Sequence, residues 1–159
     1  MRELRFEGDH LPTLTDSARV LVTIDYRRVG ILDVTCDDDP KPPFEGRSGP
    51  WLATTPGNVY LHNVDDEVVF DGHLRLETWD GPADFDPTGW QRSEVIEMDL
   101  PSGVLGIDQI TMGRRSDVYR LPAGRWRTRL AWRTDPPAAP DDLNTASILV
   151  QFWPPENPQ

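Results

Sequence analysis

The stretch that most constrains the fold is RWRTRLAWRT at residues 125–134, where apolar and polar side chains alternate. Successive side chains of a β-strand point to opposite faces, so a period of two is typical of a strand with one buried and one solvated face. The pattern predicts a strand whose apolar side chains lie in the core while its guanidinium groups lie in water. The inward set is Trp126, Leu130 and Trp132, and the outward set is Arg125, Arg127, Arg129 and Arg133.

The same period recurs along the chain, and 16 prolines and 12 glycines fall mostly between the apolar segments. Such punctuation favours many short strands, and no stretch carries a helical apolar stripe longer than about two turns. We expect roughly nine or ten strands. The best alternations are at 20–26, 74–78, 96–100, 126–132 and 148–152, and weaker candidates are 4–6, 29–35, 59–64, 68–70, 104–110 and 118–121.

Strands spaced this closely favour antiparallel pairing, because a parallel crossover needs about a dozen or more connecting residues. The predicted fold class is therefore all-β, an antiparallel two-sheet β-sandwich, with a flattened β-barrel as the alternative. A chain of 159 residues suits one domain spanning 1–159. Its proline content predicts surface loops at 37–50 and 134–142, and we expect a frayed tail at 154–159.

The clearest turn signal is LPAG at residues 121–124. Proline presets the backbone at the second position of a turn, and glycine accepts the left-handed conformation that follows. We therefore expect the segments 118–121 and 125–134 to form a hairpin.

The formal net charge is −11, yet residues 114–134 hold seven arginines and one aspartate. An acidic surface repels nucleic acid and membranes at long range and attracts basic proteins, although acidity can serve solubility alone. The single cysteine, Cys36, excludes an intrachain disulfide and fits a reducing compartment. Without a signal-like apolar run or a segment long enough to cross a bilayer, the sequence predicts a cytoplasmic, soluble protein.

Acidic residues cluster in three predicted turns. Carboxylates there could contact a basic partner, hold calcium or, as a pair across a cleft, serve glycoside hydrolysis. No segment matches an EF-hand loop, and a solvated turn in which aspartate binds local backbone donors explains the same pattern. The candidate partner-binding residues are Asp37, Asp38, Asp39, Asp65, Asp66, Glu67, Asp84 and Asp86.

Residues typical of catalysis are present only in isolation. No nucleophile elbow, phosphate-binding loop or dinucleotide fingerprint occurs, and His10, His62 and His73 lack metal-ligand spacing. Cys36 precedes three aspartates, which should raise the pKa of its thiol and weaken it as a nucleophile. We expect no catalytic residue, no cofactor and no metal.

The arginines at 125–133 suggest phosphate binding with tryptophan stacking as one use of this strand. Tryptophans of the same strand lie on the opposite face, however, so one ligand cannot contact both. Pairing with acids of neighbouring strands, such as Glu77 or Glu97, explains the arginines more simply. Cover for apolar surface and protection of a sheet edge are further structural explanations.

The run ITMGRRSDVYRLPAGRWRTRLAWRT at 110–134 resembles the C-terminal part of the competence protein J family. In that family a strand, an L-P-x-G turn and an aromatic strand ending in tryptophan precede the last strand, here SILVQFW at 147–153. Upstream, SEVIEMDLPSGVLGIDQI at 93–110 and PGNVYLHN at 56–63 are similar to earlier segments of the family. The likeness covers about residues 56–153, and we find no counterpart for the first 55 residues.

The resemblance implies a small acidic inhibitor of a DNA-entry nuclease that has no catalytic residues. We therefore expect an acidic, non-catalytic binding protein that inhibits or neutralises a basic partner, such as a nuclease or toxin, without binding nucleic acid or membranes. One alternative is a calcium- or carbohydrate-binding β-sandwich module. Another is a structural subunit of a protein complex that uses exposed aromatic side chains such as Trp51, Trp79 and Trp90. The oligomeric state stays open.

Overall fold

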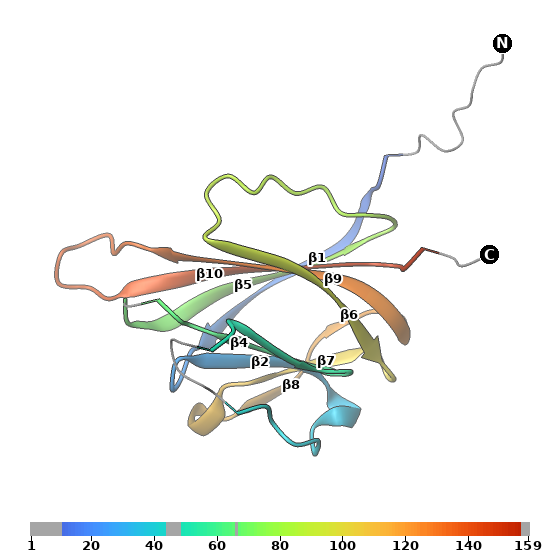
Figure 1. The fold of residues 1–159 in the computed structure, drawn as a ribbon, viewed down its shortest axis with the longest axis horizontal. Helices are drawn as coiled ribbons and strands as arrows, with labels where there is room; N and C mark the ends of the chain where they lie inside the picture. The colour runs from blue at the N-terminus through green and yellow to red at the C-terminus, as the bar shows by residue number, and fades with distance from the viewer. Residues whose placement is uncertain (1–10, 44–48, 66, 157–159) are drawn as a thin grey trace, which may run out of the picture.

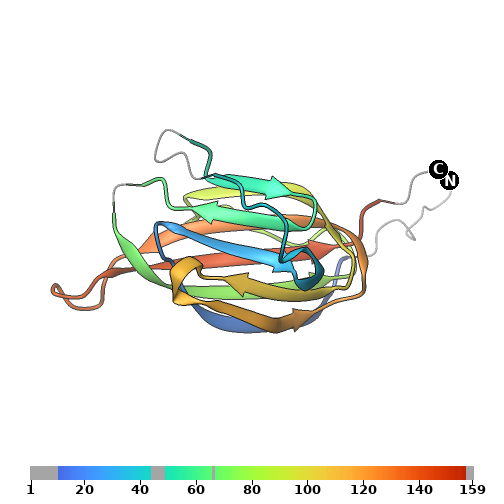
Figure 2. The same ribbon diagram turned by 90° about the horizontal axis from the view of Figure 1, so that it is seen from below.

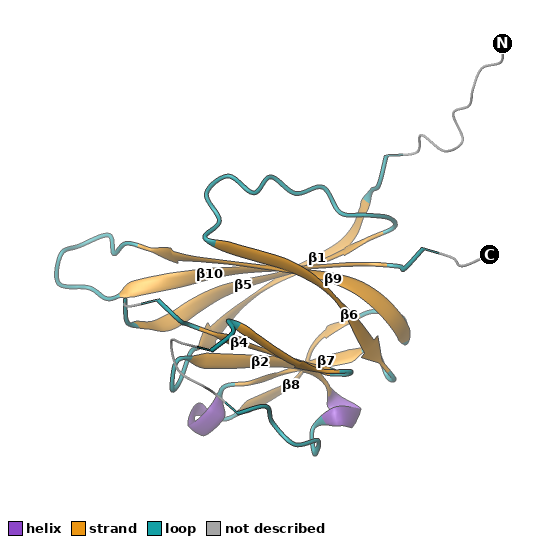
Figure 3. Ribbon diagram, in the orientation of Figure 1, coloured by secondary structure: helices purple, strands orange, loops and turns teal. Residues whose placement is uncertain are grey.

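The computed structural model describes residues 11–43, 49–65 and 67–156. Its strands form two five-stranded sheets that pack face to face (Figures 1 and 3). Two short 3-10 helices interrupt the described strands, η2 (Val34–Cys36) and η4 (Ile110–Met112). The predicted all-β sandwich is confirmed. The flattened barrel is wrong, because no described strand is hydrogen-bonded into both sheets to close them.

Sheet A is the upper layer in Figure 1, with the strand order β1-β5-β10-β9-β6. Strand β5 unites the predicted segments 68–70 and 74–78 into one strand. The bounds are β1 (Leu14–Thr23), β5 (Val69–Trp79), β10 (Asn144–Trp153), β9 (Gly124–Asp135) and β6 (Arg92–Leu100).

Sheet B is the lower layer, with the order β3-β4-β2-β7-β8, and Figure 2 shows its strands in front of sheet A. All of its neighbouring strands are antiparallel. Strand β3 has only four residues, too few to give a readable alternation, and the sequence did not predict it. The bounds are β2 (Arg28–Asp33), β3 (Leu52–Thr55), β4 (Asn58–His62), β7 (Val104–Asp108) and β8 (Arg114–Arg120).

One pairing departs from the antiparallel prediction. Strands β5 and β10 run parallel, with Leu74 opposite Ile148 and Leu76 opposite Val150. Strands β6 to β9 all lie between these two strands in sequence, so the connection is far longer than a parallel crossover requires. The prediction from close spacing applies to strands that follow each other in sequence, and the consecutive pairs β3–β4 and β7–β8 are antiparallel as expected.

The core lies between the inner faces of the two sheets. Trp126, Leu130 and Trp132 are buried at 8%, 0% and 1% exposure, which confirms the predicted inward face of β9. Arg125 and Arg127 are exposed on the other face, whereas Arg129 and Arg133 are half-buried. Across the layers the rings of Tyr119 on β8 and Phe152 on β10 stack with centroids 6.5 Å apart. Other fully buried core residues are Ile31, Leu61, Leu76, Leu100 and Ile107.

The predicted hairpin between 118–121 and 125–134 is wrong. Strand β8 pairs with β7 in sheet B, and β9 pairs with β6 and β10 in sheet A. The residues between them cross from one sheet to the other, and the Leu121 N–H donates to the Gly103 carbonyl at 2.9 Å. Proline and glycine reverse the chain locally in either case, so the turn signal does not specify which strands pair.

Gly103 makes this crossover possible. Its φ is +73°, and a Cβ atom there would lie 1.9 Å from the Leu121 carbonyl oxygen. Only glycine tolerates both the left-handed backbone and the close approach. The segment 101–103 therefore supports the passage of the chain between the sheets.

Several predicted boundaries shift. Strand β1 begins at Leu14 and ends at Thr23, so Tyr26 lies in a turn with φ of 52° rather than in the strand. Strand β9 continues to Asp135, which shortens the predicted proline-rich loop that follows. The candidate strand at 4–6 and the end of the tail, 157–159, lie outside the described residues. In the described ranges, no helix is long and apolar enough to cross a membrane.

Candidate functional site

The first acidic cluster, Asp37 to Asp39, follows strand β2 through the short helix η2. Asp37 forms an ion pair with Arg114, whose Nη1 also donates to the Asp37 carbonyl at 3.2 Å. Asp38 and Asp39 are exposed. One charge of the predicted cluster is thus already compensated within the protein.

Cys36 lies at the end of η2, directly before this cluster. Burial raises the pKa of its thiol, a hydrogen bond with Thr35 lowers it, and the charges of Asp39 and Asp33 raise it further. The predicted direction is confirmed, but burial rather than the neighbouring aspartates is the main cause.

The second cluster lies in the turn between β4 and β5. Asp65 forms an ion pair with Arg92 at 2.8 Å, and Glu67 is exposed. Asn63 shapes this turn, since its side chain accepts from the Asp65 N–H at 3.1 Å and donates to the Glu67 carbonyl at 2.9 Å. Asp66 lies outside the described residues.

The third pair, Asp84 and Asp86, lies in the loop of residues 80–91, which crosses the outer face of sheet A (Figure 1). Asp86 accepts a hydrogen bond from the Thr88 N–H at 3.0 Å, which lowers the pKa of its carboxyl group. The Asp84 carbonyl accepts from Gln151 on β10 at 3.0 Å, while its side chain is exposed. This loop is therefore fastened to the sheet with both carboxylates facing solvent.

The three clusters lie at three separate places on the molecule (Figure 1). The first adjoins η2 on the side of sheet B, the second lies at the end of the sandwich where β4 turns into β5, and the third lies above sheet A. The structure does not bring the sequence-predicted residues into a single acidic site. Within the described ranges, no group of three or more His, Cys, Asp or Glu side chains is arranged to hold a metal ion.

The second cluster adjoins exposed apolar side chains that sequence reasoning missed. Val68, Phe70 and Leu143 are 61%, 41% and 62% exposed. Phe70 and Leu143 line a groove of about 520 Å³ between the start of β5 and the loop that precedes β10. We call this region the acidic end of the sandwich. It consists of Val68, Phe70 and Leu143 with the exposed carboxylates Glu67, Asp71 and Asp142.

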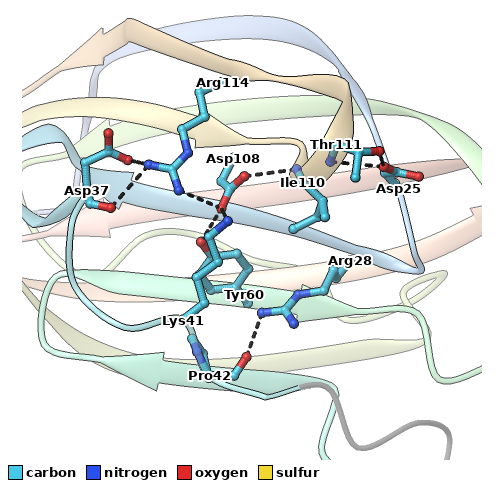
Figure 4. A network of polar contacts seen from close by, with 10 residues as sticks. All are labelled: Asp25, Arg28, Asp37, Lys41, Pro42, Tyr60, Asp108, Ile110, Thr111 and Arg114. Atoms are coloured by element: carbon cyan, nitrogen blue, oxygen red, sulfur yellow. Dashed lines mark hydrogen bonds and ion pairs between the residues drawn. The ribbon is translucent and has the colours of Figure 1, made fainter.

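A buried network around Asp108 is a further arrangement that the sequence did not reveal (Figure 4). Asp108 ends strand β7 and is completely buried. It accepts a 2.5 Å hydrogen bond from the Tyr60 hydroxyl and forms ion pairs with Lys41 at 3.0 Å and Arg114 at 3.6 Å. Burial alone would raise the pKa of the Asp108 carboxyl, but hydrogen bonds from Tyr60 and Lys41 lower it below its ordinary value.

Gly30 makes room for this network. It lies on β2 directly between Tyr60 of β4 and Asp108 of β7. A Cβ atom on Gly30 would lie 2.4 Å from the Tyr60 ring, so the bare backbone lets that ring cross β2 and reach the carboxylate. Arg28 covers the same ring at 4.6 Å and donates to the Pro42 carbonyl at 2.7 Å.

The network connects the start of the proline-rich loop to sheet B. Lys41, the only lysine of the chain, and Pro42 belong to that loop, and both are bound by residues of the sheet. Burial and the hydrogen bond to Asp108 raise the pKa of Tyr60, so this hydroxyl stays protonated. The site therefore has a structural role: a protonated Tyr60 hydroxyl and an ionised Asp108 carboxylate hold the loop against sheet B.

Comparison with known proteins gives a likeness of fold. No protein-family model matches the chain, and no curated protein matches it significantly in sequence. The solved structure of ComJ from Bacillus subtilis, the inhibitor of the DNA-degrading activity of NucA, is similar with a TM-score of 0.56 and 13% identity, over 91% of this chain and 98% of that one. The crocagin biosynthetic gene J protein is similar over 92% and 100% of the two chains, with a TM-score of 0.49 and 16% identity. The chain therefore has a ComJ-like fold.

Proposed function

We propose that this protein is a non-catalytic binding protein that inhibits or neutralises a basic protein partner, in the first instance a nuclease. The observation that carries the proposal is the ComJ-like fold over 91% of the chain, since ComJ inhibits the DNA-degrading activity of a nuclease. The resemblance of residues 56–153 to the same family points in the same direction. The net negative charge of the molecule is a second observation that favours a basic partner.

A nuclease that receives a phosphate backbone presents positive charge around its active site. A protein with a net charge of −11 is attracted to such a surface. Complementary charge raises association rates well above the roughly 10⁵–10⁶ M⁻¹s⁻¹ of neutral pairs. Because salt screens this attraction over about 10 Å at 0.1 M, the association should weaken as salt is added.

The acidic end is the surface that fits this role best. Protein interfaces place apolar anchors at the centre and charged groups at the rim. Here Phe70 and Leu143 supply exposed apolar area in a groove that Asp71 and Asp142 also line, and Glu67 is exposed in the turn before β5. We assign the direct contact to this end. The clusters at Asp37–Asp39 and Asp84–Asp86 then contribute through long-range attraction.

The test uses the full chain and a purified nuclease encoded in the same genome. DNA degradation is measured while the protein is titrated, at low salt and at about 0.5 M salt. At the higher concentration, attraction between charges is screened beyond about 5 Å. We expect inhibition that saturates near equal amounts of the two proteins at low salt and weakens at high salt. Full nuclease activity against a tenfold excess of the protein at low salt would refute the proposal.

Three double variants separate direct contact from general charge, because each removes two negative charges. The variant at the acidic end is Glu67→Gln with Asp142→Asn, and the matched controls are Asp38→Asn with Asp39→Asn and Asp84→Asn with Asp86→Asn. All three should slow association similarly. Only the first should also accelerate dissociation of the complex, and equal dissociation rates would place the contact elsewhere.

A further inference from the structure

A second groove opens on the outer face of sheet A, beside the acidic end: His73 and Ser147 in its lining follow Asp71 and Thr145 of the first groove by two residues along β5 and β10. It has a volume of about 480 Å³ and lies over strands β1, β5, β10 and β9, with Trp90 of the loop 80–91 in its lining. Two rows of side chains form its base, in register across the sheet. One row is Leu21, His73, Ser147 and Arg133, and the next is Arg19, Arg75 and Leu149.

The lining is positively charged although the protein is acidic. Arg19, Arg75 and Arg133 line the groove together with one carboxylate, Glu77. Glu77 forms an ion pair with Arg75 and Asp135 forms one with Arg133, so the charge of Arg19 is the one in excess. Glu77 is already engaged, since it accepts from Arg75 at 2.5 Å, from Trp79 at 2.8 Å and from Gln151 at 3.0 Å. Its carboxylate therefore fixes the Arg75 guanidinium in place.

Arg19 lies directly opposite Arg75 across the β1–β5 pair. Like charges at facing positions destabilise a sheet, so this pairing has a cost. Among the described residues, no carboxylate forms an ion pair with Arg19. Two guanidinium groups facing each other across one strand pair form a ready site for an anion, because each presents several donors in a fixed fork.

Trp90 supplies the aromatic surface that sequence reasoning excluded. The tryptophans of β9 do point away from the arginines, as predicted, but Trp90 reaches the arginine face from a different segment. Its ring lies 4.7 Å from the Arg133 guanidinium carbon and 6.4 Å from the ring of Phe85. Of the acids predicted to pair with these arginines, Glu97 lies directly opposite Arg127 across β6 and β9. Arg133 instead contacts Trp90 and forms an ion pair with Asp135 at 2.9 Å.

We propose that this groove binds a phosphate monoester with a flat aromatic body, of the mononucleotide class. The guanidinium groups of Arg19 and Arg75, which face each other across β1 and β5, supply the donors for the phosphate oxygens. Trp90 and Leu149 then contact the aromatic body, as apolar and aromatic walls do in small-ligand sites of roughly 300–1,000 Å³. This inference goes beyond the proposed inhibitor function, because it concerns a small-molecule ligand and not a protein partner.

The test titrates adenosine 5′-monophosphate into the full chain at low salt by calorimetry, with adenosine and inorganic phosphate as separate probes. We expect the monophosphate to bind more tightly than either probe. Arg19→Gln should weaken binding by about tenfold, since a hydrogen bond to a charged group is lost. Trp90→Leu should weaken the binding of the monophosphate by at least about fivefold, because stacking of the base is removed. The affinity for inorganic phosphate should stay unchanged.

Arg125→Gln is the matched control. Arg125 is exposed on the same face of sheet A but does not line the groove, and the variant changes the net charge by the same amount as Arg19→Gln. We expect the control to change the affinity by less than about twofold. No binding of the monophosphate at millimolar concentration, equal binding of adenosine, or equal losses in the two arginine variants would overturn the proposal.

Discussion

The Tyr60 hydroxyl donates a 2.5 Å hydrogen bond to Asp108, and both side chains are almost completely inaccessible to solvent. The pair joins strands β4 and β7 across the glycine of β2 that separates them. A buried carboxylate is stable only when donors and cations compensate its lost hydration. Tyr60, Lys41 and Arg114 supply that compensation here.

Asp108→Asn should lower the free energy of unfolding by about 2 kcal/mol, because the neutral amide leaves two cations without their shared partner. Tyr60→Phe should cost about 1–2 kcal/mol, since the carboxylate loses its buried donor. Urea unfolding followed by fluorescence measures both. Asp84→Asn, at an exposed position, is the control and should change stability by less than about 0.5 kcal/mol. If Asp108→Asn lowered the free energy of unfolding no more than the Asp84→Asn control does, the network would not stabilise the fold.

Stability should fall in acid. Burial opposes ionisation of Asp33 and Glu77, but the hydrogen bonds they accept prevail and hold both pKa values below the ordinary 3.8 and 4.5. Carboxyls with lowered pKa in the folded state stabilise it fully above their unfolded values, and this contribution is lost as pH falls through the folded values. We expect a flat stability profile from about pH 5 to 7 and a steep loss below about pH 4.

Asp33→Asn tests the origin of that acid loss. The buried Asp33 carboxylate accepts from Thr35, Ser102 and Gly103, with each distance between 2.6 and 2.9 Å. The variant should be less stable at neutral pH and should show a shallower decline in acid, since one titrating group is removed. A decline of unchanged slope, measured by urea unfolding at a series of pH values, would assign the acid loss to other carboxyls.

The two faces of β9 should respond oppositely to substitution. Trp132→Asp should prevent folding, because it leaves a cavity and buries a charge without a partner, at a cost of about 4 kcal/mol or more. Arg127→Ser should cost less than about 1 kcal/mol, because Arg127 is exposed. Circular dichroism and thermal unfolding distinguish the two outcomes. Similar losses at both positions would contradict the orientation of this strand.

Gly103→Ala should be strongly destabilising, by about 3 kcal/mol, because its Cβ atom would overlap the Leu121 carbonyl in addition to straining a positive φ. Gly89→Ala provides the comparison. Gly89 also has a positive φ, of 88°, but a Cβ atom there meets nothing within 4 Å. It should cost about 1 kcal/mol from backbone strain alone. Thermal unfolding of both variants measures the difference, and equal costs would show that the crossover tolerates displacement at residue 121.

The local features of this fold were predictable, because they depend on neighbouring residues. The alternation in 125–134 was enough to predict which side chains of β9 are buried. Pairing was not predictable in the same way. The turn signal LPAG indicates a reversal of the chain but not the sheet that the next strand joins, and nothing near residues 69–79 indicates a parallel partner at 144–153.

The same limit applies to the sites. Asp108 reads in the sequence as an ordinary polar residue at the end of a strand, and its partners come from distant elements. Trp90 lies more than 40 residues from the arginine that it contacts. The exposed residues Phe70 and Leu143 have the composition of a core, so only the folded arrangement reveals them as surface. Contacts between distant segments thus carry the functional information that composition and spacing do not contain.

Strand β10 occupies the middle of sheet A, between β5 and β9, although it is the last strand in sequence. During synthesis, β1 and β5 can pair early, but β6 and β9 cannot join them until β10 is inserted between the two pairs. Such contacts between remote segments slow folding, because a long loop must close before they form. In a nascent chain that stops short of Asn144, the edges of β5 and β9 that β10 later covers are exposed. Until β10 is made, these unpaired edges are the sites where aggregation would begin and where chaperones would bind.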